Sequence, residues 1–64
     1  MTGTEAQEAL KRKRPVKHNG IEYLYIDELR YRVDKYGIIK GYAVMIDKNK
    51  NSETVAPFCD VEVI

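Results

Sequence analysis

The chain of 64 residues contains one cysteine, one histidine and no tryptophan. Because Cys59 is alone, no disulfide can form within the chain, and one cysteine with one histidine is too few for a structural zinc site. No segment approaches the roughly 18 apolar residues of a membrane span, and the first residues lack the apolar run of a secretory signal. A free thiol fits a reducing compartment. The sequence therefore predicts a cytoplasmic protein without a membrane partner.

Signs of catalysis are equally scarce. His18 precedes Asn-Gly and is expected to be an exposed residue at a strand end, and Cys59 is expected to be a small buried hydrophobic residue. No strained nucleophile turn accompanies them, and no glycine-rich phosphate loop is present. We therefore expect no catalytic residue, no bound metal and no cofactor.

Metal-dependent DNA nicking is the less favoured alternative. Asp27 and Glu28 are adjacent carboxylates, and such an enzyme needs two or three carboxylates that converge on a metal. In a strand, neighbouring side chains point to opposite faces, so these two could act together only if a bulge redirected one of them.

The small size of the chain predicts an oligomer. A domain of this length buries only about 60% of the surface that its unfolded form exposes, so its core is marginal. Small domains usually compensate with disulfides, metals or association. Since the first two are excluded here, we expect a homo-oligomer.

Positive charge is concentrated in one short segment. Five of the eleven Lys and Arg residues fall in seven positions, although the formal net charge of the chain is only +1. These five are Lys11, Arg12, Lys13, Arg14 and Lys17. A local excess of positive charge favours a polyanion such as DNA as the partner. A solvated helix end is the competing interpretation, and the sequence leaves both open.

Residues 1–14 are expected to form a short helix that carries this basic segment, with partial disorder left open. Thr4 and Gln7 have the spacing of a capping box, and Pro15 ends the segment. Ala6, Ala9 and Leu10 form a narrow apolar stripe along the helix.

Residues 15–64 are expected to form a β-meander, within a single small domain that spans residues 1–64. Asn19-Gly20 predicts a two-residue hairpin turn, a bulge or bend is expected near Asp27-Glu28, and Gly37 suits a left-handed turn position. The apolar segment Ile38–Ile46 is typical of a central strand. Further strands are predicted over Ser52–Ala56 and Asp60–Ile64.

Alternation along the chain divides the side chains between two faces. Tyr23, Tyr25 and Tyr31 share odd parity with apolar neighbours, which favours a core or interface role over a stacking platform. Arg30 and Arg32 have the opposite parity and are predicted to extend the nucleic-acid-binding surface of the basic segment.

The last residues alternate between polar and apolar and end on isoleucine. An apolar terminus is unusual unless something holds it in place. We therefore predict that Val61, Val63 and Ile64 belong to an edge strand at the oligomer interface.

The order of these segments resembles very short proteins from phages and mobile elements of Clostridia and related bacteria. The similarity lies in Glu8-Ala9-Leu10, in Asn19-Gly20-Ile21-Glu22-Tyr23 and in the polar segment from Asp47 to Ala56. Within that group the chain is similar in size and layout to a family of small anti-CRISPR proteins. The resemblance implies an oligomeric twisted antiparallel sheet, like that of the single-stranded-DNA-binding coactivator positive cofactor four. It also implies a bacterial host cytoplasm and an action on DNA.

The sequence thus predicts an α+β, mainly β fold: a twisted antiparallel meander of four to five strands with a short N-terminal helix, in an oligomer. The predicted function is that of a phage-derived counter-defence protein that binds DNA without sequence specificity. The alternative is an oligomeric module that binds a protein or a small molecule and has no nucleic-acid role.

Overall fold

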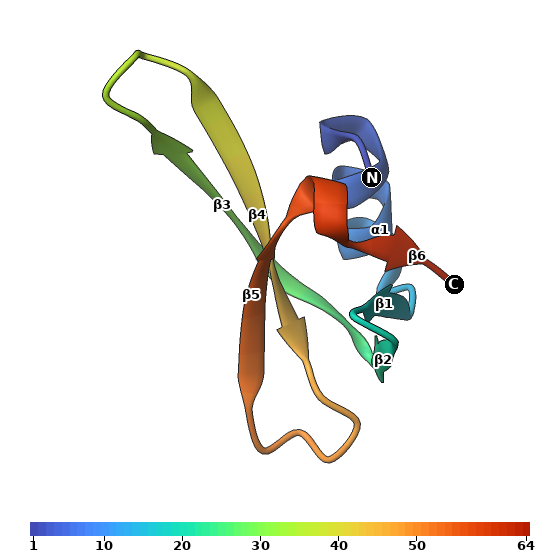
Figure 1. The fold of residues 1–64 in the computed structure, drawn as a ribbon. Helices are drawn as coiled ribbons and strands as arrows, with labels where there is room; N and C mark the ends of the chain where they lie inside the picture. The colour runs from blue at the N-terminus through green and yellow to red at the C-terminus, as the bar shows by residue number, and fades with distance from the viewer.

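The computed structural model describes all residues 1–64, as one short helix followed by six strands (Figure 1). The elements are α1 (Gly3–Arg12), β1 (Val16–His18), β2 (Ile21–Tyr23), β3 (Tyr25–Val33), β4 (Ile39–Ile46), β5 (Glu53–Pro57), the 3-10 turn η1 (Phe58–Asp60) and β6 (Glu62–Val63). The predicted mainly β, α+β class is confirmed. The strands form two antiparallel sheets, in the orders β2-β1-β6 and β3-β4-β5, where a single meander was expected. The ten-residue α1 cannot cross a membrane.

The N-cap of the helix lies two residues earlier than predicted, at Thr2. The hydroxyl of Thr2, not that of Thr4, accepts a hydrogen bond from the backbone N–H of Glu5 at 3.1 Å, and the Glu5 carboxylate accepts one from the Thr2 N–H at 3.0 Å. Both threonines have capping-box spacing, but only Thr2 is followed three residues later by a charged partner, which the helix dipole favours. Hydrogen bonds with the backbone and then the side chain of Thr2 lower the pKa of Glu5.

The two ends of the chain are tied to each other. The N-terminal amine donates to the carbonyl oxygens of Phe58 and Val61 at 2.8 and 3.1 Å. Strand β6 pairs with β1 in the same chain, with Val63 opposite Val16. Val61 is completely buried in the core of its own chain, so it has no surface to offer a second subunit. Ile64 is still exposed, and its role in an interface stays a prediction.

Two predicted turns are confirmed. Asn19 and Gly20 have φ values of 51° and 76° and connect β1 to β2, with His18 paired to Ile21. Gly37 has a φ of 79° in the turn between β3 and β4. Positive φ at these positions is what a tight hairpin turn requires.

Strands β3 and β4 form a long hairpin that extends well beyond the rest of the molecule (Figure 1). The molecule is therefore elongated, with extents of 37 × 21 × 18 Å. The register shifts between Ile26 and Glu28, which places a bulge at Asp27, as predicted. The bulge puts Ile26 and Leu29 on the same face of the sheet, opposite Met45 and Ala43.

A small core fills the space between the two sheets and α1. Its members come from every part of the chain: Ala6, Ala9, Val16, Tyr23, Ile26, Ala43, Met45, Ala56, Phe58 and Val61. The predicted helix stripe is confirmed, since Ala6 and Ala9 are completely buried and Leu10 packs against the cluster. Only 11 of 64 residues are buried, so each large core side chain matters for stability.

The contact between Gly41 and Phe58 joins the hairpin to the C-terminal segment. A Cβ atom at Gly41 would overlap the Phe58 ring, so any larger residue here must displace that ring. Tyr31, opposite Gly41 on β3, packs against the same ring edge to face, with centroids 5.8 Å apart. A close approach at Gly41 was expected, and the partner is an aromatic ring.

The polar turn between β4 and β5 is organised by Asp47. One carboxylate oxygen accepts from the backbone N–H groups of Asn49 and Asn51, each at 3.0 Å, and the other accepts from the Ser52 hydroxyl at 2.7 Å. The bond from Ser52, followed by the backbone bond from Asn51, lowers the pKa of Asp47.

We expect Gly41→Ala to destabilise the fold by about 1–3 kcal/mol, because the Phe58 ring must leave its place in the core. Gly3→Ala is the control, since an added Cβ there meets nothing within 4 Å. Urea unfolding of both variants measures the difference. In a Phe58→Leu background the effect of Gly41→Ala should shrink. An effect of the same size in both backgrounds would show that the ring contact is not its cause.

We expect acid to loosen the 47–52 turn. The pKa of Asp47 is lower in the folded state, so its stabilising effect is complete above the unfolded value of about 3.9 and is lost as the pH falls through the folded value. Amide shifts of Asn49 and Asn51 in an NMR titration should report this change. Asp47→Asn keeps the acceptor oxygen and removes the charge, so its shifts should not titrate in this range. The same titration in both proteins would contradict the assignment.

Candidate nucleic-acid interface

The β3-β4-β5 sheet has two chemically different faces. One face carries Ile26, Ala43, Met45 and Ala56 and covers the core. The other, which we call the open face, carries Tyr25, Glu28, Arg30, Arg32, Lys40, Tyr42, Val44, Ile46, Glu53 and Val55. Apart from Val44, all of these residues are at least partly exposed. Packing into the core therefore does not account for the exposed side chains of the open face.

A cationic and aromatic group lies near the middle of the hairpin on this face. Arg30 is opposite Tyr42 and Arg32 is opposite Lys40, so the pairing of β3 with β4 brings the four side chains together. The Arg32 guanidinium lies over the Tyr42 ring, 5.8 Å from its centroid. Arginine planes and aromatic rings are the surfaces on which unpaired bases stack.

The same face has a second such pair near α1. The Lys13 ammonium lies 5.4 Å from the centroid of the Tyr25 ring. Tyr25 is opposite Ile46, six residues along β4 from Lys40. We call the row of basic and aromatic residues from Lys13 and Tyr25 to Lys40 the strip. At the rise per residue of a β-strand, its two ends are about 20 Å apart.

The bulge at Asp27 explains why the tyrosines do not share one role. Their common parity predicted that Tyr23, Tyr25 and Tyr31 would lie on one apolar face. Tyr23 is indeed buried in the core. The register shift places Tyr25 on the open face and Tyr31 on the opposite one.

Among the residues that pair in register on the open face, Glu28 and Glu53 are the acidic ones. Glu28 is paired with Arg30 at 3.4 Å, and both side chains are about half exposed. An exposed pair of this kind contributes little energy and exchanges readily with other partners. Of the basic residues along this face, Arg32 and Lys13 lie over tyrosine rings and Arg30 is paired with Glu28.

The structure separates the five basic residues of the Lys11–Lys17 segment. Arg12 is ion-paired with Glu8 at 3.1 Å, and Arg14 donates to the carbonyl oxygen of Ile64 at 3.4 Å. Lys11 is exposed at the end of α1. Of the five, only Lys13 reaches a tyrosine of the open face. The predicted binding residues therefore do not form one surface.

Lys17 lies on the other sheet among acidic residues. It lies opposite Glu22 on one side and Glu62 on the other, and Glu22 itself is ion-paired with Lys48 at 3.3 Å. Arg30 and Arg32 do share a face, as their parity predicted. Lys40 was missing from the predicted set, although its even parity with Tyr42 in the same strand was a signal that could have identified it.

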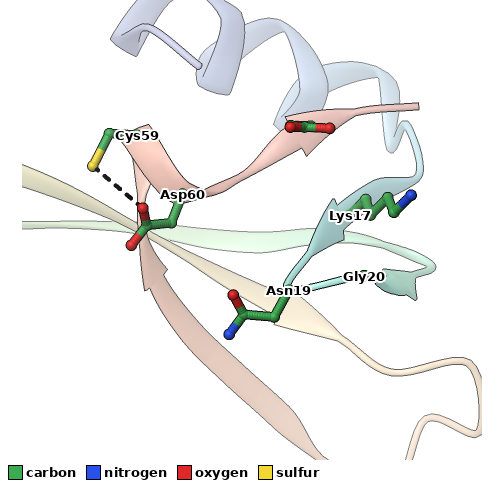
Figure 2. A pocket seen from close by; sticks show the side chains of 6 residues that line it. Lys17, Asn19, Gly20, Cys59 and Asp60 are labelled. Atoms are coloured by element: carbon green, nitrogen blue, oxygen red, sulfur yellow. Dashed lines mark hydrogen bonds between the residues drawn. The ribbon is translucent and has the colours of Figure 1, made fainter.

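A polar hollow of about 470 Å³ lies beside β1 and η1 (Figure 2). Its lining consists of Lys17, Asn19, Gly20, Cys59, Asp60 and Glu62. The Cys59 sulfur is 3.9 Å from an Asp60 carboxylate oxygen, and the Lys17 side chain points away from it in Figure 2. Cys59 is exposed, so the prediction that it is a buried hydrophobic residue is wrong.

Both ring nitrogens of His18 are already engaged. Nδ1 donates to the Asp60 carbonyl oxygen at 2.9 Å, because a carbonyl can only accept. Nε2 is left to accept from the Asn19 amide at 3.3 Å. His18 is therefore a structural residue that links β1 to η1. Elsewhere in the chain, no three His, Cys, Asp or Glu side chains come together as a potential metal site.

Comparison with known proteins adds no relative. No protein-family model matches the chain, and no curated protein or solved structure is significantly similar to it. The resemblance to small anti-CRISPR proteins therefore stays a prediction, and the case for a function depends on the residues of the open face.

Proposed function

We propose that this protein binds single-stranded nucleic acid without sequence specificity, through the open face of the β3-β4-β5 sheet. The observation that carries the proposal is the Arg32 guanidinium over the Tyr42 ring, with Arg30 and Lys40 beside it. Proteins that bind single strands in this way combine a positively charged track with aromatic platforms.

The partly exposed aromatic rings of the surface favour a single strand over a duplex. In a duplex the bases are already stacked on one another and are not available to Tyr25 and Tyr42. Unpaired bases can be splayed out over a flat surface, and their stacking is tolerant of sequence. The strip of about 20 Å would hold a few nucleotides.

The biological role that we propose follows the resemblance to small anti-CRISPR proteins. A phage-derived counter-defence protein that holds exposed DNA strands would oppose a CRISPR nuclease at its substrate. The alternative remains a module that binds a protein or a small molecule, and for such a module the basic residues would only increase solubility.

We expect the triple variant Arg30→Gln, Arg32→Gln, Lys40→Gln to bind a fluorescent oligo-dT at least tenfold more weakly than the wild type. The slope of log K against log salt concentration is roughly −0.7 per phosphate contact on single strands. Removing three contacts should therefore make this slope shallower by about 2. Fluorescence anisotropy over a series of salt concentrations measures both effects.

The matched control removes the same charge elsewhere: Lys11→Gln, Arg12→Gln, Lys48→Gln. Arg12 and Lys48 are paired with Glu8 and Glu22 away from the open face, so this variant should bind nearly as the wild type does. Equal losses of affinity in both triple variants would show that net charge, and not the open face, is responsible for binding. No binding by the wild type at low salt would overturn the proposal and favour the protein or small-molecule alternative.

Tyr42 provides a separate test of stacking. Tyr42→Leu should lower the affinity for oligo-dT about tenfold, since base–aromatic stacking contributes about 1–3 kcal/mol. Tyr42→Phe keeps the ring and should bind like the wild type. If leucine and phenylalanine behave alike, Tyr42 is not a stacking platform.

A further inference from the structure

The outer half of the β3–β4 hairpin exposes an apolar surface that the nucleic-acid proposal does not use. Tyr31, Val33 and Ile39 lie on the face opposite the open face, and Val33 pairs directly with Ile39. Tyr36 follows in the adjoining turn. All four are 54–75% exposed. We call this set the arm surface.

The arm surface continues the core beyond the point where the chain can cover it. On the same face, Ala43 and Met45 are completely buried. The covering ends at Phe58, whose ring fills the space over Gly41 and meets the edge of Tyr31. Past Tyr31 the hairpin extends away from α1 and from the other sheet (Figure 1). The apolar residues of this face thus form one continuous row, which is buried at Ala43 and Met45 and exposed at the outer end of the hairpin.

We propose that the arm surface is covered by the arm surface of a second copy of this chain. Each of the four side chains leaves on the order of 100 Å² in water. Two such surfaces in contact would remove on the order of 800 Å², the size of a weak, transient interface. The same patch on both copies forms a closed, isologous dimer.

The distribution of charge favours a second copy over a lipid surface. Arg30, Arg32 and Lys40 have the opposite parity to the arm surface and lie on the open face. An interfacial membrane segment needs its cationic residues beside the lipid headgroups. In a hairpin that laid its arm surface on a bilayer, those three residues would face away from the headgroups. Lys35 is the basic residue beside the arm surface, with its ammonium 5.1 Å from the centroid of the Tyr36 ring, and one such cation is too few for stable attraction to anionic headgroups.

This arrangement also places the interface away from the C-terminus. Val61 is buried and Val63 is paired within its own chain, so of the three predicted interface residues only Ile64 is strongly exposed. The dimer would direct its two open faces outward, and each could bind its own strand. The dimer itself does not depend on the nucleic-acid proposal, because its test contains no nucleic acid.

Sedimentation velocity from micromolar to millimolar concentration tests the inference. An interface of this size predicts a weak dimer that becomes populated toward the millimolar end of this range. Ile39→Glu should weaken the dimer at least tenfold, because dimerisation would bury an unpaired carboxylate. Ile39 is two-thirds exposed in the single chain, so the variant should fold normally, and circular dichroism checks this.

Ile21→Glu is the matched control, since Ile21 is 56% exposed on β2 of the other sheet. It should leave the dimer intact. A wild type that stays monomeric at millimolar concentration would overturn the inference. So would a dimer that survives Ile39→Glu but is lost in Ile64→Glu. A monomer that binds phosphatidylserine-containing vesicles, and loses this binding in Ile39→Glu, would assign the arm surface to a membrane instead.

Discussion

The bulge at Asp27 is the constraint on which the two proposed surfaces depend. Without the extra residue, Ile26 and Leu29 would lie on opposite faces of β3, and one of them would leave the core. With it, the residues before and after the bulge form one continuous apolar face. The opposite face is then left to Tyr25, Arg30 and Arg32. The one extra residue at the bulge therefore determines that the apolar residues of β3 lie on the core face and the charged residues on the other.

The small core has a direct consequence for the hairpin. Because so few residues are available, the body of the molecule covers only the inner half of the hairpin, and the ring of Phe58 marks the boundary. The outer half keeps the alternation of a core strand without a core beneath it. The elongated shape and the exposed apolar residues thus both follow from the small number of residues available to form a core. A second copy is the simplest way to correct it, since it needs no other component.

The sequence predicted local features well and spatial groupings less well. The Asn19-Gly20 turn, the bulge and the turn at Gly37 depend on a few neighbouring residues, and all are confirmed. The Lys11–Lys17 segment is continuous in sequence, yet the end of α1 and the start of β1 turn its members in different directions. The partnership of Arg32 with Tyr42 depends on strand register, which parity alone does not determine. The pairing of β6 with β1 likewise joins segments far apart in the chain.

The most direct test of the account is to map where a single strand touches the protein. Backbone and side-chain NMR signals would be followed as unlabelled oligo-dT is added to the isotope-labelled wild type at low salt. We predict shifts centred on Arg30, Arg32, Lys40 and Tyr42, with smaller changes at Lys13 and Tyr25. Shifts confined to Lys11 and Lys17, or spectra that do not change, would contradict the open face as the binding surface.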